Sequence, residues 1–474
     1  DCGMNQSPRP NTIVGYYPAY KYNLKSNDFN ISSSITHLNY IAFSPNDLIN
    51  VTRPYTVFQN QLDKLNQLRN YLVGKPNLKF QLILSVLLPT NEDLVKIPPF
   101  SDLASMLYNP NHNITDDLVK IVNDNSFDGI DIDYPNKLPC YQMSQPQNFG
   151  SEDLNPVFIS FLADLSSKLR QSNSSKILTV TAGQYPIDSL NSSNSDIINF
   201  VNIQAFYLNI GNKSASAGID NIQRIFNAWN SHVSKSKLVL GIDFGGIVEV
   251  VNSSNIIADT NNQNLQVVND LTTQISFADD KIQDLCGLSV YASWSWKNLS
   301  SQLLSPCYTS TNKHSQWNYG FDNKSQQPYI YQQQPNSPTR FYYVSYEDFQ
   351  SIKSKLDYVQ EVNALGIAIS DITKDTNDAT LMNFITTDVI NPPNSSSKPT
   401  PTSISSTPRS SPSHIGVIVG GIIGALIFVS VLTAAGFILY RRKHRARMPA
   451  LLLNTNNQTC SDTNNNVYSD INHQ

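Results

Sequence analysis

The feature that most constrains the fold is a regular alternation of short β-branched or apolar runs with longer segments of helical periodicity. Short runs of this kind are typical of buried strands. They occupy residues 11–17, 35–43, 78–86, 127–134, 177–182, 200–206, 238–244 and 365–372. Between them, apolar side chains recur three or four residues apart, as at Phe158, Leu162 and Leu165. This alternation across residues 10–390 predicts an α/β fold, a closed (β/α)₈ TIM barrel.

An open, doubly wound sheet is the alternative fold for such an alternation. That fold usually carries a glycine-rich phosphate loop after its first strand, and we find none there. The rhythm breaks between about residues 247 and 340, which are rich in Tyr, Trp, Gln and Pro, so we expect an insertion between strands seven and eight. Its aromatic side chains could equally pack in a core or present their ring faces to a ligand; they include Tyr291, Trp294, Trp296 and Trp317.

Residues 127–135 place acidic side chains on the inner face of an expected strand. Because side chains alternate along a strand, Asp131, Asp133 and position 135 face the same way. Two buried carboxylates are costly unless a site uses them, and the third position is Pro135, which has no proton to donate. The acids could bind a ligand, or they could be remnants bonded to neighbouring backbone. A hard-cation site is a third interpretation, but no further ligand cluster lies nearby and we expect no metal.

Charge and glycosylation signals narrow the class of protein. The chain of 474 residues has 33 basic and 37 acidic residues, so we expect no nucleic acid or other polyanionic partner. Many Asn-x-Ser/Thr sequons precede residue 391, and they include those at Asn30, Asn50, Asn113, Asn252 and Asn298. This pattern favours a secreted or cell-surface glycoprotein.

Cysteine usage agrees with an oxidising compartment. Four cysteines precede residue 391, namely Cys2, Cys140, Cys286 and Cys307. They allow three disulfide pairings, and the sequence does not choose among them. A Cys286–Cys307 bridge is our preferred pairing because it would close a short local loop.

The C-terminal part of the chain predicts membrane attachment. Residues 391–413 form a Ser/Thr/Pro-rich stalk, and residues 415–440 carry no charge over a length sufficient to span a bilayer. The basic run that follows places residues 441–474 in the cytoplasm. With a transmembrane helix over 414–440, the prediction is a single-pass type I protein of the plasma membrane or cell surface.

Two smaller expectations concern the chain end and the membrane helix. The first residue is Asp1, as expected after removal of a signal peptide, and residues 1–9 form a short N-terminal segment. Within the span, Gly416, Gly420 and Gly424 recur every four residues, a spacing that permits close helix–helix approach and possible homo-association.

Several motifs in the right order resemble glycoside hydrolase family 18, the chitinases and chitinase-like lectins. The family's fourth strand reads Asp-Gly-x-Asp-x-Asp-x-Glu, which residues 128–134 match before the pattern breaks. Residues 14–17, 36–40, 238–245 and 345–368 resemble the first, second, seventh and eighth strand regions. The resemblance implies no cofactor, and it implies binding of chitin or N-acetylglucosamine oligosaccharides through Tyr16, Asp131, Asp133, Gln204 and Tyr207.

The resemblance also implies a mechanism that this sequence cannot complete unaided. In the family a glutamic acid protonates the glycosidic oxygen, and an aspartate two residues earlier orients the substrate's acetamide, which attacks the sugar. Those positions are Pro135 and Asp133, with Asp131 in support. Phe206 stands where the family's sixth strand supplies a tyrosine hydroxyl, unless a one-residue shift lets Tyr207 supply it. Ser370 stands where the family has the tryptophan that forms the floor of the sugar site. In the third strand, Ser85 is not followed by the family's glycines.

The leading interpretation is therefore a membrane-anchored, chitin-binding protein that has lost hydrolytic activity. Two alternatives stay open. One is an active chitinase whose acid is supplied from elsewhere, for instance by Glu152, and the other is a cell-wall scaffold that binds no sugar.

Overall fold

The computed structural model describes residues 10–21, 31–43, 54–59, 61–88, 106–107, 114–134, 151–208, 216–257, 265–268, 275–283, 290–303 and 316–386. The chain divides into two compact units, Asp1–Pro393 and Asn394–Gln474, and every described residue belongs to the first. Within the described residues, no helix is long and apolar enough to cross a membrane. The span predicted at 415–440, its three glycines and all cysteines lie outside these ranges, so the membrane anchor and the disulfide pairing stay predictions.

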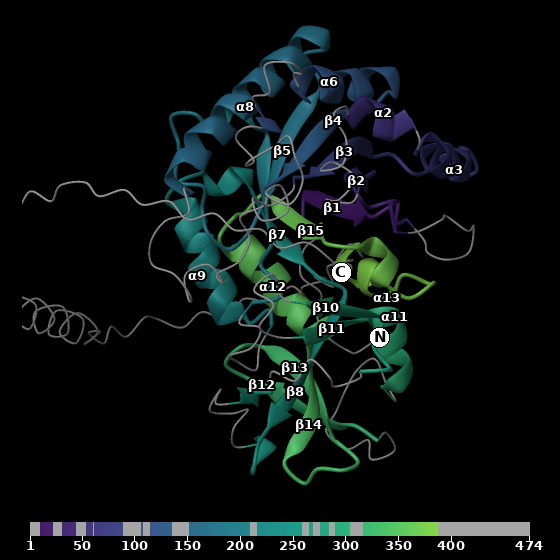
Figure 1. Ribbon diagram of the computed structural model, residues 1–474, viewed down its shortest axis with the longest axis vertical. Helices are drawn as coiled ribbons and strands as arrows, with labels where there is room; N and C mark the ends of the chain where they lie inside the picture. The colour runs from purple at the N-terminus through teal and green to yellow at the C-terminus, as the bar shows by residue number, and fades with distance from the viewer. Residues whose placement is uncertain are drawn as a thin grey trace, which may run out of the picture. The chain divides into compact units, whose positions relative to one another are not determined.

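Parallel strands close into a barrel in the order β1-β15-β7-β6-β5-β4-β3-β2 (Figure 1). Their bounds are β1 Thr12–Tyr17, β2 His37–Ile41, β3 Gln81–Leu87, β4 Gly129–Asp133, β5 Ile177–Ala182, β6 Phe200–Ile203, β7 Leu238–Ile242 and β15 Gly366–Ile369. Each strand falls on one of the runs that the sequence predicted. The eight-stranded parallel barrel is therefore confirmed, and the open sheet is wrong.

Helices lie along the outside of the barrel strands (Figure 1). The α-helices are α2 Pro54–Gln59, α3 Leu62–Val73, α6 Ile114–Asp124, α8 Ser151–Ser172, α9 Ile219–Asn230, α11 Trp296–Leu299, α12 Phe349–Glu361 and α13 Thr380–Thr386. Short 3₁₀ turns are η1 Ser195–Ile197, η2 Lys235–Lys237, η3 Ser300–Gln302 and η4 Ile372–Lys374. The predicted apolar stripe of α8 is buried, since Phe158, Leu162 and Leu165 are inaccessible to solvent.

A second, antiparallel sheet lies between β7 and β15 in the sequence. Its order is β10-β11-β8-β14-β13-β12, and β9 pairs with β8. The strands are β8 Gly245–Asn252, β9 Gln266–Val267, β10 Asp280–Gln283, β11 Val290–Ser295, β12 Asn318–Asp322, β13 Gln327–Gln333 and β14 Arg340–Tyr346. Trp294 and Trp296 are buried, which makes them core residues, and Trp317 packs against Trp294 at a ring distance of 5.5 Å.

Side chains of the barrel strands alternate between two environments. Outward-facing residues such as Leu38, Ile130 and Leu240 belong to the main core beneath the helices. Inward-facing residues form a separate, smaller apolar cluster of Val14, Tyr16, Ile41, Phe200, Val239 and Ala368. This separation follows from the two-residue period of a strand.

A buried ion pair joins the second sheet to α12. Lys355 Nζ lies 2.7 Å from the Glu347 carboxylate, and the two side chains are 1% and 2% exposed. Ser351 also donates to Glu347 (2.6 Å). Burial raises the pKa of Glu347, an effect that the Lys355 charge opposes. An unpaired carboxylate here would be strongly unfavourable.

Replacing Lys355 with Met should therefore lower the free energy of unfolding by about 3–5 kcal/mol, because Glu347 would be left buried without its cation. Denaturant unfolding measures the change. The matched control is Lys353→Met on the same helix, whose partner Asp357 is 50% exposed; the loss there should stay within about 0–1 kcal/mol. Similar losses in the two variants would contradict this account of the pair.

Candidate functional site

The carboxyl ends of the barrel strands meet at one mouth, and the polar side chains of two separate clusters lie at or below it. In parallel barrels, strand-end residues from distant parts of a chain converge at this end. One cluster surrounds Asp131 of β4, and the other joins the ends of β6, β7 and β15.

Asp131 lies at the centre of a ring of neutral polar side chains inside the barrel. It is the inward-facing middle residue of β4 and is fully buried. Its carboxylate accepts hydrogen bonds from Thr179 (2.7 Å), Ser85 (2.9 Å), Thr181 (2.9 and 3.1 Å), Tyr16 (3.3 Å) and the Asn202 amide (3.4 Å). These partners come from four other strands, and only closure of the barrel brings them together.

The ring around Asp131 is also bonded to itself. Asn202 donates to the Tyr16 hydroxyl (2.8 Å), and the hydroxyls of Tyr16 and Thr181 are hydrogen-bonded to each other. Burial raises the pKa of Asp131, while the hydroxyl donors oppose the rise. Burial and the neighbouring Asp131 charge also raise the pKa of Tyr16, so its phenol stays protonated and can continue to donate.

Asp131→Asn should remove a pH-dependent destabilisation. Because the folded state holds the Asp131 proton more tightly than the unfolded state, stability falls as the pH rises from the unfolded pKa of about 3.9 through the raised folded value. The melting temperature of the variant, relative to wild type, should therefore increase from about pH 3.5 to pH 7. Thermal unfolding across this range measures it. A difference that does not change with pH would contradict the raised pKa. Where the difference does change with pH, its pH-independent part reflects only the altered hydrogen bonds.

Asp133 ends β4 at the next inward position and is 5% exposed. Pro135 lies outside the described residues, as does the side chain of Glu152 in the first turn of α8, so neither acid-related prediction is tested here. In the described ranges, no group of three or more His, Cys, Asp or Glu side chains is placed to hold a metal ion.

The second cluster is an ion pair with two hydroxyls attached. Lys374 Nζ donates to both Asp243 oxygens (2.8 and 3.0 Å) and to the Tyr207 hydroxyl (2.6 Å). Tyr207 donates to Asp243 (2.9 Å), and the Ser370 hydroxyl donates to the other Asp243 oxygen. Each oxygen of Asp243 thus accepts two hydrogen bonds. Burial opposes protonation of Lys374, but the Asp243 charge beside it raises the pKa of the lysine overall, so the lysine is an ammonium ion.

Tyr207 has an unusual backbone conformation. Its φ angle is 57°, in the left-handed region that a tyrosine adopts only when its surroundings require it. The Lys374–Asp243 pair holds its hydroxyl, and the Phe206 ring meets its ring edge-on at 5.0 Å. Phe206 in turn lies over Gly241, where an added Cβ would come 3.1 Å from the ring.

The predicted site residues therefore fall into two groups. Tyr16 and Asp131 are in direct contact, whereas Tyr207 belongs to the ion-paired cluster, and Gln204 follows β6 with its backbone bonded to Ala182 (2.8 Å). Sequence reasoning missed Asp243 and Lys374. The inward register of β7 could have revealed Asp243, but the short turn that holds Lys374 carries no comparable signal.

Comparison with protein-family models identifies one family. A model of the family described as glycosyl hydrolases family 18 matches residues 12–375. A chitinase from Rhizomucor miehei has a TM-score of 0.54 and 18% identity, covering 79% of this chain and 99% of that one. A class V chitinase from Nicotiana tobaccum in complex with NAG4 has a TM-score of 0.52 and 16% identity, covering 80% and 98%.

A spore cortex-lytic enzyme from Bacillus megaterium is also similar, with a TM-score of 0.50 and 15% identity over 80% of this chain and 75% of that one. At such identities these likenesses show the fold alone. Comparison with curated proteins gives no match.

Proposed function

Because the chain belongs to glycosyl hydrolases family 18, we propose that it is a chitinase-like protein that binds chitin or N-acetylglucosamine oligosaccharides without hydrolysing them. One contrast carries the proposal. The hydrogen-bonded support of Asp131 is complete, whereas the sequence has Pro135 at the position from which the family's acid would act.

The chemistry of glycoside cleavage explains why this contrast favours binding over turnover. Without a general acid, the leaving sugar must depart as an alkoxide, and a positioned acid contributes about 10²–10⁴-fold to the rate. The residues left at the mouth can still accept and donate hydrogen bonds to a sugar. We assign this role to Asp133, supported by Asp131 and Tyr16, and to Gln204 at the end of β6. Tyr207 would contribute its ring, because its hydroxyl is held by Asp243 and Lys374.

The proposed setting is the cell surface. Residues 415–440 would anchor the chain in the plasma membrane, the stalk at 391–413 would hold the barrel outside, and Gly416, Gly420 and Gly424 would allow homo-association in the bilayer. The Rhizomucor and Nicotiana structures are named as chitinases, the latter with NAG4 bound, which supports an N-acetylglucosamine oligomer as the ligand class to test.

The test measures binding and cleavage of chitotetraose by the full-length protein in lipid nanodiscs. Wild type should bind without producing shorter oligomers, and Asp133→Ala should weaken binding at least about tenfold, or ~1.4 kcal/mol. The control Asp188→Ala changes an acid that is 86% exposed and should leave the affinity unchanged. Pro135→Glu should introduce measurable cleavage if only the acid is missing.

Cleavage by wild type above the rate of Asp133→Ala would overturn the assignment of a non-hydrolytic protein. No binding by wild type would overturn the assignment of a sugar ligand and favour a scaffold.

Membrane attachment has a separate test. Deleting residues 415–440 should release the protein from cells into the medium, because these residues form the proposed membrane span. Deleting the stalk at 391–413 instead should leave the protein in the membrane pellet after alkaline carbonate extraction. Release of the undeleted protein by carbonate would contradict the anchor.

A further inference from the structure

The segment that leaves β6 is fixed at both of its described ends. At its start, Tyr207 is bound by the Lys374–Asp243 ion pair. The chain returns at Ser216, whose carbonyl accepts a hydrogen bond from the Leu208 N–H (2.5 Å). Tyr207 therefore lies directly beside a backbone bond that closes the base of the connection to α9.

The returning end is attached to the second sheet. The Ala217 N–H donates to the Gln327 side-chain carbonyl (3.0 Å), and the Ser216 N–H donates to the Ser345 hydroxyl (3.3 Å). The Gln327 amide nitrogen donates to the Ser216 hydroxyl (3.4 Å). Gln327 is 2% exposed and Ser345 is 3% exposed, so water does not compete for these bonds.

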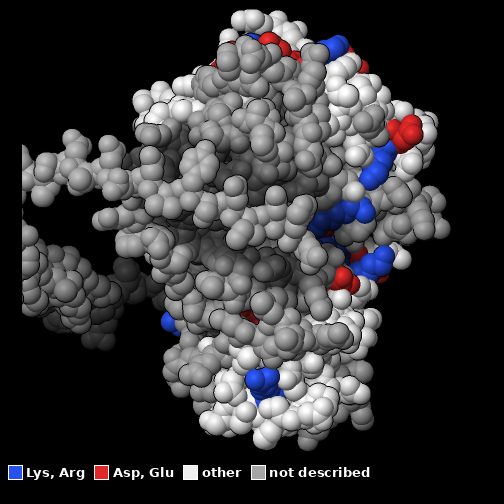
Figure 2. Space-filling view, viewed as in Figure 1, with Lys and Arg blue, Asp and Glu red and all other residues white. Residues whose placement is uncertain are grey.

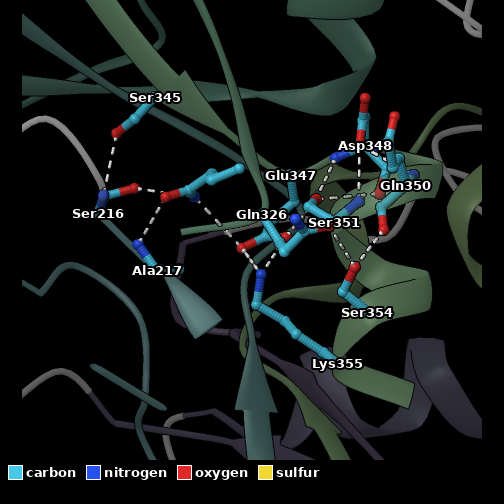
Figure 3. A network of polar contacts seen from close by, with 11 residues as sticks. Ser216, Ala217, Gln326, Ser345, Glu347, Asp348, Gln350, Ser351, Ser354 and Lys355 are labelled. Carbon is cyan, nitrogen blue, oxygen red and sulfur yellow. Dashed lines mark hydrogen bonds and ion pairs between the residues drawn. The ribbon is translucent and has the colours of Figure 1, made fainter. Parts of the chain in front are cut away.

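Gln327 is itself held by the buried pair of Glu347 and Lys355, which Figure 3 shows among its polar neighbours. Its amide also lies 3.5 Å from Glu347 Oε1, the oxygen to which Lys355 donates at 2.7 Å. Because the Gln327 side chain receives a backbone donor on its oxygen and meets acceptors with its nitrogen, its orientation is determined. An amide fixed in this way can hold Ala217 in only one position.

The Glu347–Lys355 and Lys374–Asp243 ion pairs are also connected through the start of β8. The backbone N–H of Glu347 donates to the Gly245 carbonyl (2.9 Å), two residues after Asp243. The second sheet thus reaches the end of β6 along two routes, one through Gln327 and Ser216 and the other through Gly245 and Asp243.

We infer that Gln327, oriented by the Glu347–Lys355 pair, is a positioning residue for Tyr207 and the end of β6. The second sheet holds the mouth of the barrel in one geometry through this side chain. The left-handed backbone of Tyr207 is consistent with this role, since such a conformation persists only where the surroundings determine it. The part of the inference that concerns ligand affinity rests on the proposed function, whereas the part that concerns the β6 segment does not.

The experiment compares Gln327→Met with Gln332→Met in the full-length protein. Methionine approximates the size of glutamine but forms no comparable hydrogen bonds. Gln332 is on the same strand, β13, and donates to Gln316 (3.3 Å). Hydrogen exchange is measured on the peptide that contains Leu208, together with the melting temperature and the affinity for chitotetraose.

Exchange at Leu208 should become at least about tenfold faster in Gln327→Met and stay within about twofold of wild type in Gln332→Met. Each protein is measured at the same interval below its own melting temperature. Affinity for chitotetraose should fall in the first variant alone. If Gln327→Met does not fold, Ser345→Ala removes the acceptor of the Ser216 N–H with a smaller change and should accelerate the same peptide.

Unchanged exchange at Leu208 in folded Gln327→Met or Ser345→Ala would overturn the inference. Faster exchange with unchanged affinity would overturn its link to the ligand. If wild type binds no oligosaccharide yet exchange responds as expected, the proposed function fails while the positioning role of Gln327 stands.

Discussion

Closure of the barrel between β1 and β15 is the interaction on which the rest of the structure depends. The first and last strands pair in parallel, with Thr12 opposite Gly366 and Gly15 opposite Ile369. Gly366 permits this approach, because an added Cβ would lie 2.0 Å from the Thr12 carbonyl oxygen. Closure also places the Tyr16 hydroxyl in reach of Asp131, so the polar ring in the barrel interior is a product of the same contact.

Two buried carboxylates near the mouth of the barrel, those of Asp131 and Asp243, are stabilised in different ways. Asp131 is surrounded by hydroxyl and amide donors, and its charge is opposed by no cation among its described partners. Asp243 instead has the full charge of Lys374 beside it. The first arrangement leaves a carboxylate whose protonation can change, and the second is electrically neutral and fully hydrogen-bonded. Among the described residues on the face seen in Figure 2, basic and acidic side chains lie close together along one edge.

Much of the fold could be predicted from the sequence, because a strand buried on both faces and an amphipathic helix each leave a periodic pattern. The eight barrel strands and the position of Asp131 follow from that pattern. Most partners of Asp131 do not, since Thr179, Thr181 and Asn202 look like ordinary polar residues until the barrel closes. Lys374 was missed for a related reason, because its partners Tyr207 and Asp243 are far away in the sequence.

The buried pair of Glu347 and Lys355 limits how this protein could have been assembled or could be redesigned. The second sheet cannot be excised between β7 and β15, or exchanged for another, as an independent module. Removing it with Glu347 would leave Lys355 of α12 as an uncompensated ammonium ion in the interior of the barrel unit. The second sheet and helix α12 therefore cannot be exchanged separately, and a chimaera that separates them should fail to fold.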